Sequence, residues 1–219
     1  LSLAAIEVPK EQASRFGVIE IDPSYKVSSF IEKPKSPPTI PDKQGHSFVN
    51  MGIYVFNIAA LKEVFVKMEK EKISDHDFGK DIIPFMLKND YHVQAYRFID
   101  ENKKDKPYWI DVGTIDSYYA ASMDLINVSP HFNLYDYDWP LRTQQQQYPP
   151  VKTVSHEGER VGRAINSLVS DGTIISGGLV ERSIVGFNVR VNSYTYITDS
   201  IIFDNCNIGR YARLRRTII

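Results

Sequence analysis

Two short strings place charged residues at the ends of expected strands, where they could bind a ligand. Glu32 and Lys33 stand together before Pro34, and Asp111 precedes a Val-Gly pair. An ammonium group offers a compact positive charge to an anion, and a carboxylate at a strand end can hold Mg²⁺ against phosphates. Each string also has an ordinary explanation, because Glu32 and Lys33 can form a solvated ion pair and Asp111 can cap a helix. On spacing alone, the ordinary explanation is favoured for the Glu-Lys pair.

Other residues that could do chemistry are less specific. Gly17 permits a close approach of the backbone to a ligand, Trp109 can stack on one or fill the core, and Asp77 can bind or cap a helix. The single cysteine, Cys206, is expected to be structural. The histidines show no metal-ligand spacing and are expected to be structural or surface residues: His46, His76, His92, His131 and His156.

The elements that must position these residues form two patterns. Over residues 1–128, apolar alternation and helical periodicity predict strands that alternate with helices, which is typical of an α/β layered domain. The expected strands are 1–8, 16–22, 26–34, 48–56, 91–99 and the end of one at 108–114, with a hairpin at Asp22-Pro23-Ser24. Helices are expected over 59–72, from about 78 with Asp77 as N-cap, and over 115–126 with Thr114 as N-cap.

Residues 129–160 are rich in proline and aromatic residues without a clear period, so we expect a connecting segment there. A six-residue period then predicts a left-handed parallel β-helix over 161–219. The expected inward residues are Leu179, Val185, Val191, Ile197 and Phe203, followed after one five-residue step by Ile208 and Leu214. Neither end of the chain finishes its pattern and the sequence lacks an initiator Met, so we expect a fragment.

The composition narrows the class of protein. Of the 219 residues, 42% are hydrophobic and 24% charged, as in globular proteins. The net charge of −1 favours neither nucleic acid nor a membrane surface, and no apolar run is long enough to span a bilayer. The one cysteine fits a reducing cytoplasm.

The order of several strings resembles bacterial ADP-glucose pyrophosphorylase (glucose-1-phosphate adenylyltransferase). These strings are ASRFGVIEID, FIEKPKSPP, MGIYVF, HDFGKDIIP, PYWIDVGTIDSYYAASMDL, LYDYDWPLRT, NSLVSDGTIISG and VRVNSYTYI. The resemblance implies a partial Rossmann-like, GT-A-like mixed sheet followed by the β-helix. It also implies a cytoplasmic, allosteric homotetramer that uses Mg²⁺ and converts ATP and glucose 1-phosphate to ADP-glucose and pyrophosphate for glycogen synthesis.

The same resemblance implies roles for individual residues. Lys33 would contact the sugar phosphate, Asp111 would bind Mg²⁺, and glucose would be contacted by Gly17, Glu32, Asn50, Asp77 and Trp109. Asn50 is a departure, because the family usually has Ser there; Asn can still donate and accept hydrogen bonds. The family's Gly-rich ATP loop is absent from the sequence. We therefore assign no catalytic residue and expect the chain alone to be catalytically incomplete.

Other readings remain open at this point. The chain could belong to a non-catalytic regulatory subunit, to a structural or interaction module of the same family, or to another sugar nucleotidyltransferase. A hexapeptide acyltransferase is disfavoured because residues 173–219 contain no histidine. A basic cluster near the end could edge an effector site or form a solvated rim: Arg210, Arg213, Arg215 and Arg216.

Overall fold

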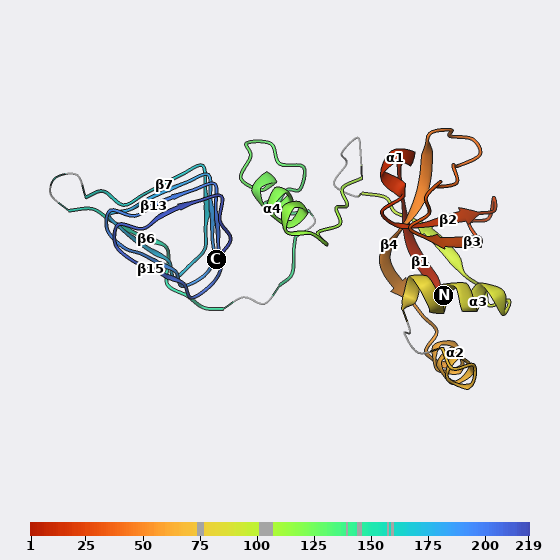
Figure 1. The fold of residues 1–219 in the computed structure, drawn as a ribbon. Coiled ribbons are helices and arrows are strands. Elements are labelled where there is room, and N and C mark those ends of the chain that lie inside the picture. The colour runs from red at the N-terminus through yellow and green to blue at the C-terminus, as the bar shows by residue number, and fades with distance from the viewer. Residues whose placement is uncertain (74–76, 101–106, 139, 144–145, 157, 159) are drawn as a thin grey trace. The chain divides into compact units, whose positions relative to one another are not determined.

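A computed structural model describes the chain except for residues 74–76, 101–106, 139, 144–145, 157 and 159 (Figure 1). Contacts divide the chain into two compact units, Leu1–Trp109 and Ile110–Ile219. This division falls earlier than the boundary at residue 128 that the sequence suggests. Each unit is described by itself. No helix among the described residues is long and apolar enough to cross a membrane.

The first unit is built on a mixed five-stranded sheet. Its strands are β1 (Ser2–Pro9), β2 (Gly17–Ile21), β3 (Val27–Glu32), β4 (His46–Val55) and β5 (Gln94–Arg97), in the order β3-β2-β4-β1-β5. β1 runs antiparallel to β4 and parallel to β5. β2 and β3 form the expected hairpin, and their register sets Gly17 opposite Glu32. The mixed sheet is thus confirmed.

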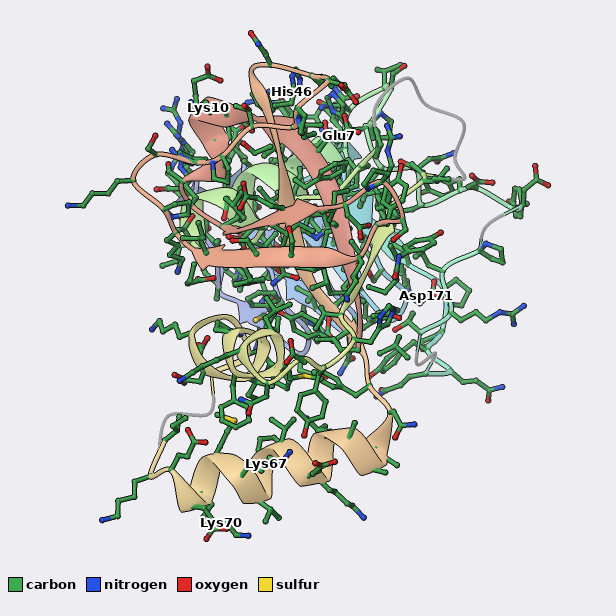
Figure 2. All side chains as sticks on the ribbon, turned by 90° about the vertical axis from the view of Figure 1, so that its right-hand side faces the viewer. Glu7, Lys10, His46, Lys67, Lys70 and Asp171 are labelled. Carbon is green, nitrogen blue, oxygen red and sulfur yellow. The ribbon has the colours of Figure 1, made fainter. Side chains whose placement is uncertain are left out.

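Helical segments accompany this sheet. α1 (Lys10–Ala13) contacts β1 and β4, and the π-helical turn η1 (Phe78–Ile82) and α3 (Ile83–Lys88) contact β3. α2 (Ile58–Lys70) joins the same apolar cluster as these strands through the face that the helical period predicts. In α2 the side chains of Val64 and Met68 are fully buried, and each contributes about 1.5–3 kcal/mol. Lys67 and Lys70 lie in the last turn of α2 (Figure 2), where positive charge interacts favourably with the negative end of the helix dipole.

The expected strand end near residue 110 does not form. The Tyr108 N–H donates to the Asp100 carboxylate at 2.8 Å, and the Gly113 N–H donates to Asp111 at 3.1 Å. Side chains therefore satisfy backbone groups that a neighbouring strand would otherwise pair. The following helix α4 (Ile115–Asp124) begins as predicted, with Thr114 and Ser117 in a capping box.

The second unit contains the β-helix, whose strands stack in three parallel sheets (Figure 1). The sheet orders are β16-β13-β10-β7, β14-β11-β8 and β15-β12-β9-β6. The strands are β6 (Lys152–Val154), β7 (Arg163–Ile165), β8 (Leu168–Val169), β9 (Ile174–Ser176), β10 (Leu179–Glu181), β11 (Ile184–Val185), β12 (Arg190–Val191), β13 (Tyr196–Thr198), β14 (Ile201–Ile202), β15 (Asn207–Ile208) and β16 (Arg213–Arg215). The first of these, β6, lies in the segment expected to be a connector.

The inward register of the β-helix differs from the sequence prediction at Phe203. Its side chain is 48% exposed, whereas Ile202 is 1% exposed and stacks in register on Val185. Similarly, Val180 is fully buried and Leu179 only partly. The five-residue step recurs at one corner, where Arg182 and Asp199 have positive φ of 42° and 49°. Positive φ also occurs at the other corners, among them Asn188 and Tyr194, but the interval from Tyr194 to Asp199 is five residues and not six. This shorter interval moves the inward residue from Phe203 to Ile202.

Helix α4 packs against the β-helix within the second unit. The Tyr119 hydroxyl donates to the Asp199 carbonyl at 2.6 Å, and the rings of Tyr118 and Phe203 lie 6.3 Å apart. These contacts explain why α4 groups with the β-helix although the family pattern places it before the connector.

Candidate functional site

The Glu32 carboxylate occupies a space that two glycines leave open. A Cβ built on Gly17 would overlap the Phe30 ring and lie 2.9 Å from Glu32 Oε2, and one on Gly79 would lie 2.7 Å from the same oxygen. Both distances to Oε2 are too short for a Cβ unless the Glu32 carboxylate moves from its position. Gly17 comes from β2 and Gly79 from η1, so two separate elements converge on this carboxylate. Only 25% of the Glu32 side chain is exposed, so this residue is not simply a solvated half of a surface pair.

Lys33 lies beside this carboxylate and faces solvent. Its Nζ is 3.7 Å from Glu32 Oε1, and 64% of its side chain is exposed. The backbone turns sharply here, with a φ of 46° at Lys33 and its N–H donating to the Phe16 carbonyl at 3.0 Å. An exposed pair of this length contributes little stability. The ammonium can therefore exchange this weak partner for a ligand anion.

Tyr54 and Phe78, which sequence reasoning missed, belong to the same site. The Asn50 amide donates to the Tyr54 hydroxyl at 2.6 Å, and the Tyr54 ring stacks on Phe78 with centroids 5.1 Å apart. Burial raises the pKa of Tyr54, the hydrogen bond from Asn50 lowers it, and the negative charges of Glu32 and Asp77 raise it further, for a net increase. The phenol therefore stays protonated at neutral pH. A signal existed in the sequence, since Gly52 in an apolar strand marks a bulge.

Asp77 is confirmed as the helix cap. Its Oδ1 accepts from the N–H groups of Gly79 and Lys80 at 2.9 and 2.8 Å. The cap fixes the start of η1 and thereby the position of Gly79 against Glu32. The Asp77 charge also acts on Tyr54. Direct contact of Asp77 with a ligand stays a prediction.

Trp109 and Asp111 fall on the two sides of the division between the units. The Trp109 ring packs edge-on against Phe16 at 5.3 Å and joins a partly buried apolar cluster, which fits the core reading; stacking on a sugar stays a prediction. Asp111 belongs to the second unit, where it is exposed. Among the described residues no group of three His, Cys, Asp or Glu side chains could hold a metal. His76 lies outside those residues.

The basic cluster near residue 219 makes contacts within the β-helix. Arg210 lies over the rings of Tyr194 and Tyr211, each 5.8 Å away, and Arg213 lies over Tyr196 at 4.8 Å. These cation–π contacts support the reading as a basic rim. The role of the cluster as the edge of an effector site stays a prediction.

A cavity of about 690 Å³ lies elsewhere on the first unit. Its lining includes Glu7, Lys43 and Arg97, and neither Glu32 nor Tyr54. The Glu7 carboxylate pairs with Lys43 at 2.6 Å and with Arg97 at 2.7 Å. Glu20, Asp22 and Asp42 also line the cavity, so its acidic residues outnumber its basic ones, which disfavours a phosphate. The volume of a cavity therefore does not by itself identify the ligand-binding site. The Glu32 region combines a carboxylate, an exposed cation, a protonated phenol and two close glycines, which suits a ligand that is rich in hydroxyls and negatively charged.

Comparisons with known proteins agree with this chemistry. Residues 2–128 match the model of the nucleotidyl transferase family, and residues 149–219 match a GlmU-like, C-terminal hexapeptide model. Similar proteins named glucose-1-phosphate adenylyltransferase come from Nitrosomonas europaea (45% identical over 100% of this chain and 51% of the relative), Methylococcus capsulatus (46%, 100% and 51%) and Geobacter metallireducens (48%, 100% and 54%). The chain thus spans about half the length of the curated relatives it matches.

Proposed function

The chain belongs to the nucleotidyl transferase family, and on that premise we propose that it carries the sugar-phosphate half of a glucose-1-phosphate adenylyltransferase. The reaction would join glucose 1-phosphate to the adenylyl group of ATP and release pyrophosphate. The observation that carries the proposal is the Glu32 carboxylate held between Gly17 and Gly79, with Lys33 beside it. The names of the relatives favour this activity over another sugar nucleotidyltransferase, a regulatory subunit or an interaction module.

In this function the residues bind and orient the sugar phosphate. Glu32 accepts hydrogen bonds from glucose hydroxyls, each contributing about 1.5–3 kcal/mol because the acceptor is charged. The Tyr54 hydroxyl donates to a second sugar oxygen, and Lys33 neutralises the phosphate. A phosphate oxygen then attacks the α-phosphorus of ATP, the bond to the leaving pyrophosphate breaks, and fixed geometry lowers the barrier.

Asp111 would hold Mg²⁺ in this reaction. Mg²⁺ is usually bound through one or two carboxylates together with substrate phosphates, and an exposed single carboxylate fits that requirement. When bound, the ion would offset the negative charge that accumulates on the phosphates. Cytoplasmic location, allosteric regulation and assembly as a homotetramer are further parts of the proposal that rest on the family resemblance.

Ligand binding tests the proposal, because the chain spans about half of its relatives. Isothermal titration of the chain with glucose 1-phosphate should give saturable binding, with weaker binding of N-acetylglucosamine 1-phosphate and inorganic phosphate. We expect Glu32→Gln and Lys33→Ala to weaken glucose 1-phosphate binding about tenfold or more. Lys35→Ala is the matched control, since Lys35 is an exposed lysine outside the site. If Glu32→Gln and Lys33→Ala bind glucose 1-phosphate as tightly as the unmodified chain does, the proposal is wrong.

A further inference from the structure

Strand β4 is irregular between Asn50 and Tyr54. Opposite it on β1, Leu3 pairs with Tyr54 and Ala5 pairs with Asn50, so two steps on β1 match four on β4. Gly52, at the centre of this bulge, has a positive φ of 74°. In a regular strand the Cα atoms of residues four apart are separated by about 13 Å. The bulge shortens that span, and the Asn50 amide reaches the Tyr54 hydroxyl at 2.6 Å.

The orientation of the Asn50 amide follows from its second partner. The backbone N–H of Gly52 can only donate, so the Asn50 atom that faces it at 3.1 Å must be the oxygen Oδ1. The nitrogen Nδ2 therefore faces Tyr54 and donates to it. Because a phenol has one proton and here accepts from Asn50, the Tyr54 proton must point to a different acceptor.

Tyr54 lies beside η1 at the candidate site, because its ring stacks on Phe78, the residue before Gly79, and Gly79 borders Glu32. Stacking on Phe78 at 5.1 Å and a tilted contact with Phe56 at 6.1 Å hold the ring in place. Among the residues that the structure describes, Asn50 supplies the one hydrogen bond of the Tyr54 hydroxyl. Glu32 and Asp77 are near enough for their charges to act on this phenol. The candidate site thus offers a ligand a hydrogen-bond donor, the Tyr54 hydroxyl, and a hydrogen-bond acceptor, the Glu32 carboxylate.

We propose that Asn50 is a positioning residue that commits the Tyr54 proton to the ligand, so that the sugar phosphate must present an acceptor oxygen at that point. The inference rests on the proposed function and deepens it. The Asn50 oxygen and one of its amide protons are used within the protein, and the second amide proton is left. A double-mutant cycle separates a direct contact through that proton from an effect through Tyr54. The proposal thus gives a role to Asn50, which stands where the family usually has Ser.

A double-mutant cycle tests this coupling. Glucose 1-phosphate affinity is measured by titration calorimetry for the unmodified chain, Asn50→Ala, Tyr54→Phe and the double variant. Each single change should weaken binding about threefold to tenfold, the loss of one hydrogen bond. The double variant should bind no more weakly than Tyr54→Phe alone. If Asn50→Ala weakens binding equally with and without the Tyr54 hydroxyl, Asn50 contacts the ligand directly and the inference is wrong.

Asn50→Asp provides a second variant of the same shape, in case Asn50→Ala does not fold. Both of its carboxylate oxygens accept, so Tyr54 would donate to Asp and lose its donor to the ligand. Binding should weaken more in the presence of the Tyr54 hydroxyl than in the Tyr54→Phe background, where only charge repulsion of the phosphate remains. Equal weakening in the two backgrounds would overturn the inference.

A readout without ligand separates this inference from the proposed function. The pKa of Tyr54 is followed by NMR of ¹³C-labelled tyrosine as pH is raised. Removing the Asn50 amide should raise this pKa further, because the hydrogen bond from Asn50 lowers it. An unchanged pKa would refute the Asn50–Tyr54 coupling. Absence of glucose 1-phosphate binding by the unmodified chain would instead refute the proposed function, and the titration would still decide whether Asn50 acts on Tyr54.

Discussion

Replacing Gly79 with Ala should displace the Glu32 carboxylate without weakening the fold. The new Cβ would lie 2.7 Å from Glu32 Oε2 and 3.3 Å from Cδ, whereas ordinary contact begins at 3.4 Å. The carboxylate must therefore withdraw by about 0.7 Å, which lengthens its hydrogen bonds to a bound sugar and weakens them. Alanine also gains up to about 1 kcal/mol of helix propensity over glycine, so unfolding should need no less denaturant.

Titration calorimetry with glucose 1-phosphate measures the effect. We expect Gly79→Ala to bind about 10-fold to 100-fold more weakly, the loss of a hydrogen bond to a charged acceptor. Gly209→Ala is the matched control, because a Cβ at Gly209 meets nothing within 4 Å. Its affinity should equal that of the unmodified chain.

The same substitution in a Glu32→Ala variant shows whether Gly79→Ala weakens binding by displacing the Glu32 carboxylate. In Glu32→Ala the carboxylate is gone, so adding Gly79→Ala should cause no further loss of affinity. Unchanged binding by Gly79→Ala alone would refute the role of the glycine. A loss that persists in the Glu32→Ala background would show that Gly79 acts on the ligand by another route.

Three further predictions concern the second unit. Ile202→Ala should lower the free energy of unfolding in urea by about 3 kcal/mol and Phe203→Ala by about 1 kcal/mol, because only Ile202 is buried; the reverse order would restore the simple six-residue register. The hydrogen bond from Arg182 holds the pKa of Asp199 below its ordinary 3.8, so this carboxylate stabilises the fold above pH 3.8, and the effect is lost as pH falls through the lower folded value. The stability difference between the unmodified chain and Asp199→Asn should therefore shrink between pH 6 and pH 2, and a constant difference would count against the pairing. Thr114→Ala should cost about 1 kcal/mol in thermal unfolding through loss of the capping box, and an unchanged midpoint would contradict it.

Local features of the fold could be predicted because local chemistry decides them. Asp77 and Thr114 cap their helices as expected, since a short polar side chain before a helical pattern satisfies the first N–H groups. The β2–β3 hairpin follows from alternation on either side of the Asp22 turn. Glu32 and Lys33 could be proposed as site residues through resemblance alone, because their types and spacing suit an ordinary surface pair.

The surroundings of Glu32 could not be predicted in this way. Gly79 and Tyr54 are distant from Glu32 in the sequence, and only the packing of η1 and the bulge in β4 brings them to its site. A propensity scale assigns glycine to a turn or flexible point, but it does not say which carboxylate needs the space that the missing Cβ leaves.

In the β-helix, the sequence pattern and the tertiary structure each determine a different feature. The sequence by itself determines that a six-residue period builds stacked parallel strands, because one apolar residue recurs on each side of the coil. It does not determine which of the neighbouring apolar residues Ile202 and Phe203 faces inward, since either satisfies the hydrophobic pattern. The tertiary structure decides this, because the interval between the corners at Tyr194 and Asp199 is five residues and the sheet register then pairs Ile202 with Val185.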